Sequence, residues 1–313
     1  MPDTFFTASP HWTWWIVFYF FVGGIAGSAF LLASMLHLAG RPADRPLVRL
    51  GYYTAFVGVL VSGALLTVDL GRPERFWHML IESNTGRPMF KSWVPMSVGS
   101  WILLLFGLFA FLAALAALSE ERSDRRVLQS GPIRVLRQRG PSAVIAVAGS
   151  VFGLFFAGYT GVLLAVTNRP VWADSTLLGV LFLVSAASTG AAALILLATW
   201  RRAGHPASVR WLAWFDRRVL ILELVVLILF LASLGSVARV FLGWWGVVLV
   251  LGVMGIGILA PLLLERGQRG AARHHLVRSA SLVLLGGFLL RVVVLLSSHD
   301  IHVLGSGVTG GSP

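Results

Sequence analysis

The sequence contains no cysteine and few charged side chains. Of its 313 residues, 57% are hydrophobic and 12% are charged, and the mean hydropathy is +0.83. An ordinary soluble domain carries about twice this share of charged residues, so the composition excludes a soluble globular protein. Without cysteine, the chain forms no disulfide, no thiolate metal site and no iron–sulfur cluster of its own. Any such cluster must belong to a partner protein.

The sequence also lacks the motifs of hydrolytic and nucleotide chemistry. It has no Walker, HExxH or GxSxG pattern and no dinucleotide fingerprint after a predicted strand. A transmembrane haem needs two histidines at matched depth on facing helices, whereas the eight histidines lie in predicted loops, helix ends and termini. We therefore expect this protein to bind neither haem nor a metal ion.

Long apolar stretches predict an all-α, polytopic membrane protein. A bilayer core about 30 Å thick needs roughly 20 apolar residues per helix, and eight stretches meet this requirement. They lie at residues 14–38, 50–68, 93–118, 142–166, 176–200, 219–237, 244–264 and 276–297. The first stretch has no basic segment before it and no cleavage motif after it, so we expect it to be retained as a helix.

The fifth stretch repeats the small-residue pattern of the first, with Gly190 aligned to Gly27. This pattern favours two four-helix bundles related as a parallel repeat. The predicted division is 1–141 for helices 1 to 3 and their loops, 142–175 for the helix that completes the first half, and 176–313 for the second half.

The distribution of basic residues predicts the orientation. Loops after odd-numbered helices carry 18 Lys and Arg residues, and the opposite side carries 6. By the positive-inside rule, both termini face outside. This loop bias accounts for the net charge of +12, so we expect the lipid bilayer, and no nucleic acid, as the partner surface.

One polar segment, residues 69–93, stands against this bias. Its sequence is DLGRPERFWHMLIESNTGRPMFKSW, and it holds four of the six basic residues predicted outside. Gly71-Arg72-Pro73 should end the second helix just after Asp69. Residues 74–79 should form a short interfacial helix, residues 84–88 should form turns, and Pro95 should lie in the first turn of the third helix. Charges kept on this side suggest a function.

Two tyrosines are predicted near the same membrane face. Tyr19 lies about two turns inside the first helix, and Tyr159 lies in the sequence GYTG of the fourth helix. A buried tyrosine hydroxyl needs a polar partner, and for both residues core packing and ligand contact remain open. Together with the polar segment, they indicate a pocket for an amphipathic ligand with a polar head and an apolar tail, which is the description of a quinone.

Two charges lie within predicted membrane helices. Glu223 is predicted one turn inside the sixth helix, near the inner face, and Arg291 is predicted nearer the outer face of the eighth. Each such charge costs about 2.5–3.5 kcal/mol at a helix centre, so both should face the protein interior. At these depths we expect no direct pairing, and they can serve either as structural ion-pair members or as parts of a proton pathway.

Four segments together carry a family resemblance: LTVDLGRPERFWHML, AGYTGVLLAVTNRPVW, LFLVSAASTGAAALIL and GGFLLRVVVL. With them the protein resembles, over nearly its whole length, the NrfD-like membrane subunits of polysulfide reductase and related respiratory complexes. The resemblance implies an eight-helix, cofactor-free anchor of the bacterial cytoplasmic membrane that binds menaquinone or ubiquinone. It also implies two partners, a ferredoxin-like [4Fe-4S] subunit and a molybdopterin-containing catalytic subunit.

The resemblance also suggests roles for individual residues. Tyr159 is the best donor to the quinone head group, and Asp69 and His78 are the catalytic proton exchangers. The quinone site is expected to include these three residues and Tyr19, Arg72 and Trp77. Docking of the partner is assigned to Arg75, Arg87 and Lys91, and the proton pathway to Glu223 and Arg291.

Two other functions are compatible with the sequence. The apparent repeat and the buried charges also suit an ion-coupled transporter, although no span shows a clear unwound break at its middle. Ile16 and Phe20 flank Tyr19 with apolar side chains, so a passive anchor without an active quinone site is the third hypothesis.

Overall fold

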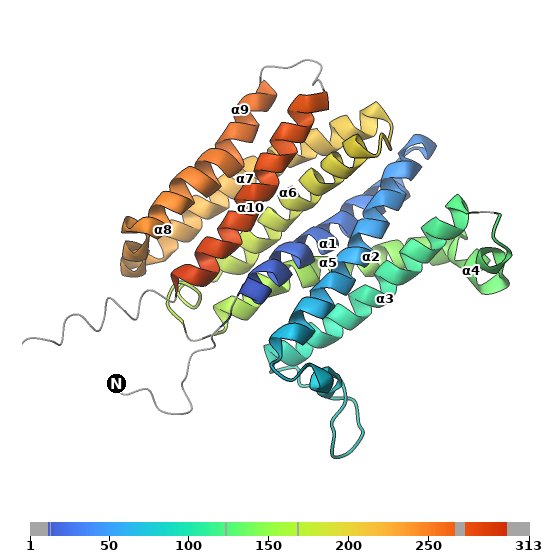
Figure 1. Cartoon of the computed structure of the whole chain (residues 1–313), viewed down its shortest axis with the longest axis horizontal. Helices are drawn as coiled ribbons and strands as arrows, with labels where there is room; N and C mark the ends of the chain where they lie inside the picture. The colour runs from blue at the N-terminus through green and yellow to red at the C-terminus, as the bar shows by residue number, and fades with distance from the viewer. Residues whose placement is uncertain (1–11, 13, 123, 168, 267–272, 299–313) are drawn as a thin grey trace, which may run out of the picture.

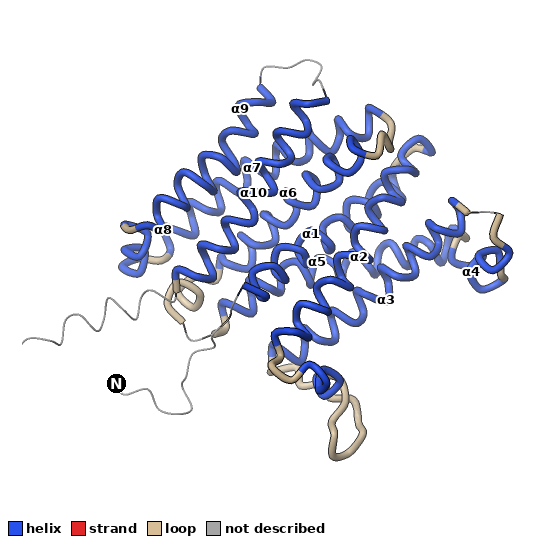
Figure 2. Tube along the Cα trace, viewed as in Figure 1, coloured by secondary structure: helices blue, strands red, loops and turns tan. Residues whose placement is uncertain are grey.

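The structure is a computed structural model that describes residues 12, 14–122, 124–167, 169–266 and 273–298. These residues form helices joined by loops, without a named strand among them (Figure 2). The long helices are α1 (Trp14–Ala39), α2 (Arg45–Asp69), α3 (Pro95–Glu121), α5 (Arg139–Ala165), α6 (Leu177–Trp200), α7 (Pro206–Ser233) and α10 (Arg273–Ser297). The shorter ones are η1 (Pro42–Asp44), η2 (Pro73–Met79), η3 (Arg126–Gln129), α4 (Gly131–Leu136), η4 (Gly235–Leu242), α8 (Trp244–Val247), η5 (Val248–Leu259) and α9 (Ala260–Arg266).

The helices confirm the prediction of an integral, multi-pass membrane protein. Among the described residues, seven helical segments are long and apolar enough to cross a bilayer, and α8, η5 and α9 together form one of them. The pair α7 and η4, which meet at a bend of 110°, passes the same test together, so the number of spans is eight if this bent pair is one span. Each span covers one of the eight apolar stretches recognised in the sequence.

Several helices begin earlier than their apolar stretches. The sixth span was predicted to start at residue 219, but α7 begins at Pro206 behind His205, whose ring accepts a hydrogen bond from the backbone N–H of Ala207 at 3.2 Å. Hydropathy marks only the part of a helix that matches the hydrocarbon core, and polar residues extend it into the interface. Glu223 therefore lies in the middle of α7, while its position one turn inside the membrane stays a prediction.

Helix α1 is the central element of the fold, since it packs against α2, α5, α6 and α10 (Figure 1). Its neighbours approach at positions without room for a larger side chain. A Cβ atom on Gly27 would collide with the backbone of Gly153 in α5, and one on Gly190 in α6 would collide with Ser28. Small residues allow this close approach in lipid, where helix association depends on packing rather than on the hydrophobic effect. Gly23 and Gly27, which have the GxxxG spacing, both face α5 and therefore mark a helix crossing.

Contacts divide the long helices into two neighbourhoods. Helix α1 contacts α2 and α5, and α3 contacts both α2 and α5, while in the second half α6 contacts α7 and α10, and α10 contacts η5. Contacts of α1 and α5 with α6 join the two groups. The repeat relation between the halves and the sidedness of the termini remain predictions.

The seventh span contains a feature that the sequence analysis did not predict. Residues Val248–Leu259 form a π-helix, η5, in which backbone bonds run from residue i to i+5. The segment keeps helical hydrogen bonds, so it is not an unwound break of the kind expected in a transporter. It packs closely on α10, where Gly257 meets Gly286 with no space for a side chain.

The central crossing gives a stability prediction. Replacing Gly27 with Ala should force α1 and α5 apart, because the added methyl group meets the Gly153 carbonyl, and such overpacking costs typically about 1–3 kcal/mol. The matched control is Gly63→Ala in α2, where a Cβ atom meets nothing within 4 Å. Thermal unfolding of the detergent-solubilised protein should show a lower Tm for Gly27→Ala only. Equal Tm values for the two variants would contradict the crossing.

Candidate functional site

A large cavity lies between α1, α2, η2, α3 and α5, at the end of the bundle that carries residues 69–93. Its volume is about 920 Å³, and most of its lining is apolar. Helix α3 supplies one wall through a stripe of residues at helical spacing, namely Met96, Gly99, Leu103, Gly107 and Phe111. Some lining residues are also exposed on the outer surfaces of α2 and α3. The exposed fraction is 57% for Leu60 and 47% for Leu104. It is therefore open toward the lipid between α2 and α3.

Tyr159 of α5 lies at the polar end of this cavity. Its hydroxyl group donates a hydrogen bond of 2.5 Å to the backbone carbonyl of Pro95, in the first turn of α3. Its ring rests on Gly99, where a Cβ atom would overlap the ring. The room for this ring thus comes from a glycine of the neighbouring helix, and not from Gly158 and Gly161 beside Tyr159 in α5, which face α6.

Tyr19 of α1 lines the same cavity. The side chain is only 3% exposed, and its ring packs against Phe156 with the centroids 6.0 Å apart. It is close enough to Tyr159 for the two phenols to interact electrostatically. No described residue forms a hydrogen bond with the Tyr19 hydroxyl group. A cavity ligand with a carbonyl oxygen would supply the acceptor that this buried donor needs.

Asp69 is the last residue of α2 and also lines the cavity. The helix ends here because Gly71 adopts a positive φ of 67°, which an L-residue with a side chain rarely adopts, and because Pro73 follows. The predicted end of the second helix is confirmed. Asp69, Tyr19 and Tyr159 therefore come from three helices to one cavity.

The 3-10 helix η2 confirms the predicted interfacial helix at residues 74–79 but turns a different face to the cavity. Phe76 and Met79, with Leu80 after them, line the cavity. Trp77 and Arg72 are exposed, and His78 is half-buried with its ring 3.8 Å from that of Trp77. These three residues are not among those that line the cavity. The i, i+3 spacing of Phe76 and Met79 was the signal that could have identified the inward face.

The segment after η2 folds back on itself and projects beyond the ends of the long helices (Figure 1). Ile81 and Pro88 form an antiparallel bridge, and the indole N–H of Trp101 donates to the Met89 carbonyl at 2.9 Å. The side chain of Arg75 is exposed on η2, and those of Arg87 and Lys91 are exposed on this segment. The cations proposed for docking are thus displayed on a loop that α3 holds in place.

Buried polar side chains also lie between α6, α7 and α10. Arg291 donates to the Ser185 hydroxyl at 2.9 Å and to the Gly287 carbonyl at 2.6 Å. Glu223 lies within hydrogen-bonding reach of Ser185 and Ser188 and interacts electrostatically with Arg291. Ser188 in turn donates to Asp216 at 3.0 Å. We name these five residues, Ser185, Ser188, Asp216, Glu223 and Arg291, the buried polar network.

The structure changes the interpretation of the two membrane charges. No direct ion pair between Glu223 and Arg291 occurs among the described residues, as expected, but the expected reason was wrong. They do not lie at opposite depths, and Ser185 bridges them. The sequence did not indicate Ser185, Ser188 or Asp216 as members of a network. Serine in a small-residue helix does not stand out from packing residues, and Asp216 lies before the predicted start of the sixth span.

Metal-binding geometry is not present in the described part of the protein, where no group of three or more His, Cys, Asp or Glu side chains could hold an ion. The fold and the cavity define a class, a multi-pass helical membrane protein with an amphipathic cavity that opens to the lipid.

Comparison with known proteins identifies the family. The family described as "Polysulphide reductase, NrfD" matches residues 3–301, which is nearly the whole sequence, so the chain belongs to the NrfD family.

Three curated relatives show the range of this similarity. The sequence is 26% identical to the protein NrfD homolog of Haemophilus influenzae, over 94% of its own length and 96% of that protein. It is 28% identical to a polysulfide reductase chain from Wolinella succinogenes, over 91% and 93%. It is 25% identical to a selenate reductase subunit from Mesobacillus selenatarsenatis. That match covers 61% of this sequence and about half (48%) of the selenate reductase subunit. The helical spans and these bacterial relatives fit a location in the bacterial cytoplasmic membrane.

The buried polar network gives a second stability prediction. Arg291→Met should destabilise the protein by about 3–5 kcal/mol, because it leaves Glu223 buried without its electrostatic partner. The double variant Arg291→Met with Glu223→Gln should recover most of that loss, since no uncompensated charge remains. Thermal unfolding in detergent measures both. A double variant as unstable as the single one would show that Arg291 contributes through packing alone.

Proposed function

We propose that the protein is the membrane anchor and quinone-reactive subunit of a respiratory oxidoreductase complex. It passes electrons between a partner's [4Fe-4S] cluster and menaquinone or ubiquinone in the bilayer. The observation that carries this proposal is the cavity of about 920 Å³, whose mostly apolar lining includes the polar side chains of Tyr19, Tyr159 and Asp69. A quinone has the same division into a polar head and an apolar tail.

The chemistry of the residues fits this ligand. The Tyr19 hydroxyl group is a donor for one quinone carbonyl oxygen, and the Tyr159 hydroxyl group becomes a donor for the other when it turns from the Pro95 carbonyl to the ligand. The walls from α2 and α3 take the isoprenoid tail. When bound, the quinone accepts two electrons and two protons to become quinol. The electrons come from the partner's cluster, and Asp69 exchanges protons at the cavity end, with His78 on η2 resupplying them from the water phase. Arg72 and Trp77 form the outer rim of the site.

The partners follow from the docking loop and from the relatives. Two relatives carry the names of reductase components, one of polysulfide reductase and one of selenate reductase. We assign to this protein the same kind of complex, with a ferredoxin-like [4Fe-4S] subunit beside the cavity and a molybdopterin-containing subunit beyond it. Arg75, Arg87 and Lys91 offer positive charge to the surface of the iron–sulfur subunit.

The buried polar network supports a proton pathway as a further part of this function. Its ionisable members are Asp216 and Glu223 of α7 and Arg291 of α10. The serine hydroxyls between them can both donate and accept protons. The same network would serve an ion-coupled transporter, and solute flux through vesicles containing this protein alone would favour that alternative.

The head-group site is tested by removing one hydroxyl. Tyr159→Phe should lower kcat/KM for the quinone substrate by about 10–100-fold in the intact complex, because a buried hydrogen bond of about 1.5–3 kcal/mol is lost. Tyr53→Phe is the matched control, since it removes a phenol hydroxyl that binds Glu121 at the opposite end of the bundle. Full quinone turnover in Tyr159→Phe would leave the passive anchor as the better interpretation.

Docking and proton exchange are separable in a second experiment. Asp69→Asn should leave assembly intact and slow turnover, because the amide does not exchange protons. Arg75→Gln with Arg87→Gln should weaken co-purification of the iron–sulfur subunit, whereas Arg125→Gln, an exposed cation at the other end of the bundle, should not. Affinity purification followed by a quinol oxidation assay measures both properties. Normal assembly of the Arg75/Arg87 variant would show that the partner docks on another surface.

A further inference from the structure

A second cavity lies at the opposite end of the bundle from Asp69. Its volume is about 380 Å³, and it is bounded by the end of α1, by η1, by the start of α2, by the end of α3 and by α4 and α5. The basic residues in its lining are His37, Arg41, Arg45, Arg49, Arg137 and Arg139, and the acidic residue is Glu120. Unlike the first cavity, this one is strongly basic.

The positive charge in this cavity is only slightly compensated. Glu120, the one carboxylate in its lining, pairs with Arg49 at 3.5 Å. The Nε atom of Arg49 is buried and has no hydrogen-bond partner among the described residues. A buried guanidinium N–H without an acceptor is costly, so the cavity lacks an acceptor that a bound anion would supply.

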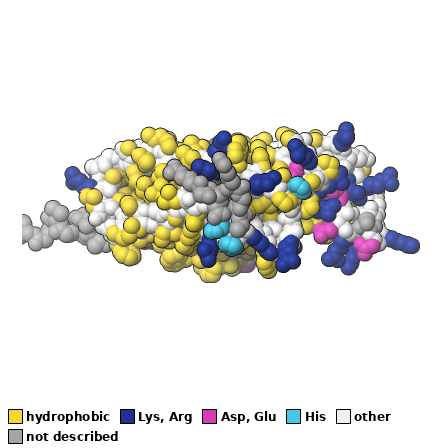
Figure 3. Space-filling view, turned by 90° about the horizontal axis from the view of Figure 1, so that it is seen from above, with side chains coloured by type: hydrophobic (Ala, Val, Ile, Leu, Met, Phe, Trp, Pro, Cys, Tyr) yellow, Lys and Arg dark blue, Asp and Glu magenta, His cyan; other side chains and the backbone are white. Residues whose placement is uncertain are grey.

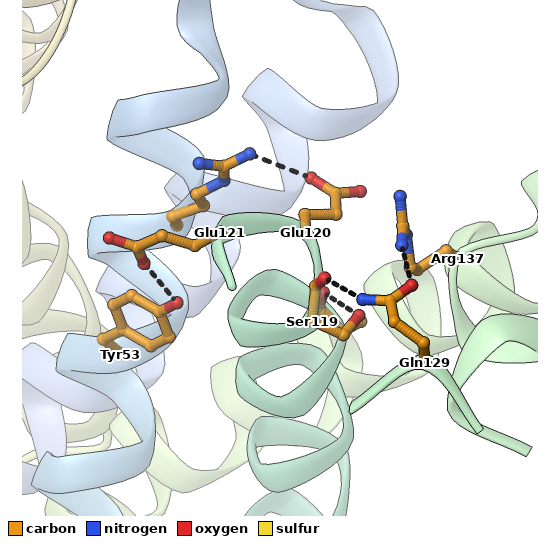
Figure 4. Close-up of polar contacts among 8 residues, drawn as sticks. Tyr53, Ser119, Glu120, Glu121, Gln129 and Arg137 are labelled. Atoms are coloured by element: carbon orange, nitrogen blue, oxygen red, sulfur yellow. Dashed lines mark hydrogen bonds and ion pairs between the residues drawn. The ribbon is translucent and has the colours of Figure 1, made fainter. Parts of the chain in front are cut away.

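Nearby acidic groups are already engaged elsewhere. Glu121 accepts a hydrogen bond from the Tyr53 hydroxyl at 2.8 Å, on the other side of the α3 terminus (Figure 4). Asp44 accepts from the backbone N–H of Arg41 at 2.6 Å and from the hydroxyl of Ser208. Neither carboxylate lines the cavity, but Asp44 acts electrostatically on Arg41. Three of the five arginines, Arg45, Arg137 and Arg139, thus have no carboxylate partner among the described residues.

One wall of the cavity is braced by side chains. The amide of Gln129 donates to the Ser119 carbonyl at 3.0 Å, and Arg137 donates to the Gln129 side-chain oxygen at 3.4 Å (Figure 4). These bonds tie the segment with η3 and α4 to the end of α3. Arg137 is thereby held at the cavity mouth, as preorganised binding requires.

The cavity is not uniformly polar. Leu36, Val48, Ala113, Ala117 and Ile145 form apolar parts of its wall, and they belong to the membrane-spanning helices α1, α2, α3 and α5. The arginines belong to the interfacial ends of these helices and to the loops. In the view of Figure 3, Lys and Arg side chains gather at the right-hand end, the end that carries α4 in Figure 1. A ligand here meets cations at its head and hydrocarbon at its tail.

We propose that this second cavity binds the phosphodiester head group of an anionic phospholipid, with its acyl chains running from the apolar part of the cavity wall into the bilayer. Guanidinium groups bind phosphate oxygens in bidentate geometry, and basic pockets between membrane helices bind anionic head groups. A zwitterionic phospholipid is a poorer ligand, because its ammonium group meets the arginines. The proposal is independent of the quinone site, since the two cavities share no lining residue.

The test uses the purified full-length protein and three probes, which are phosphatidylglycerol, phosphatidylcholine and inorganic phosphate. Native mass spectrometry counts lipids retained from mixed micelles, and a Tm shift on addition of each probe gives the relative affinity. Phosphatidylglycerol should bind with at least about tenfold preference over phosphatidylcholine. Inorganic phosphate at the same concentration should neither shift the Tm nor displace the lipid.

The variants separate a built site from general surface charge. Arg45→Gln with Arg137→Gln should lower phosphatidylglycerol retention about tenfold or more, while Arg210→Gln with Arg217→Gln, two exposed arginines of α7 outside the cavity, should leave it unchanged. Arg45→Lys with Arg137→Lys keeps the charge and should retain part of the affinity. Retention in this variant shows that the loss in the Gln variant comes from the missing charge and not from misfolding. Ala116→Phe fills the cavity without changing charge and should also abolish retention.

Three outcomes would overturn the proposal. Equal retention of phosphatidylcholine would remove the need for a negative head group. Binding of inorganic phosphate as strong as that of the lipid would make this a site for free phosphate. An equal loss in the Arg210/Arg217 variant would show that basic charge anywhere on this end of the molecule attracts the lipid.

Discussion

The close packing of α1 against its neighbours is the constraint on which the rest of the structure depends. Glycine, alanine and serine occur around this helix so that α2, α5, α6 and α10 approach its backbone. Within a bilayer, this packing replaces the hydrophobic effect as the source of association. It also sets the geometry of the first cavity, because Tyr19 lies one turn before Gly23 on α1, and Gly23 contacts Phe156, three residues before Tyr159 on α5. The α1–α5 crossing therefore sets the spacing of the two phenols.

The contact between Tyr159 and Gly99 is a second close approach that depends on a small residue. Tyr159 enters the cavity only because Gly99 leaves space for its ring, and its hydroxyl then holds the first turn of α3 through Pro95. This single contact joins α5 to the start of α3, and so to the loop of residues 69–93 that leads into it. Cavity shape and loop position are thus coupled, which suits a subunit that must present a ligand near a docked partner.

The sequence predicted much of the fold, because membrane helices must be long and apolar. It predicted the apolar spans and the end of α2 at Asp69, whereas the third helix was expected from Trp93 and α3 begins at Pro95. It did not predict the extension of α7 to Pro206, because hydropathy ends at the hydrocarbon boundary and helices do not. For the site, it selected Tyr19, Asp69 and Tyr159, which share one cavity, but the wall from α3 was missed. Leucine, methionine and glycine on that helix differ from lipid-facing residues only through their tertiary contacts.

The buried polar network shows why such contacts are outside the reach of a single sequence. Arg291 fits between α1, α6 and α10 because Gly24 and Gly287 leave room for its guanidinium group, and Ser185 supplies an acceptor. Each of these small residues alone is an ordinary packing residue. A charge buried in the membrane is stable only when several helices supply space, acceptors and an opposite charge together. Such an arrangement is costly to keep for stability alone, since apolar side chains of similar volume pack as well, and this favours a role in moving protons.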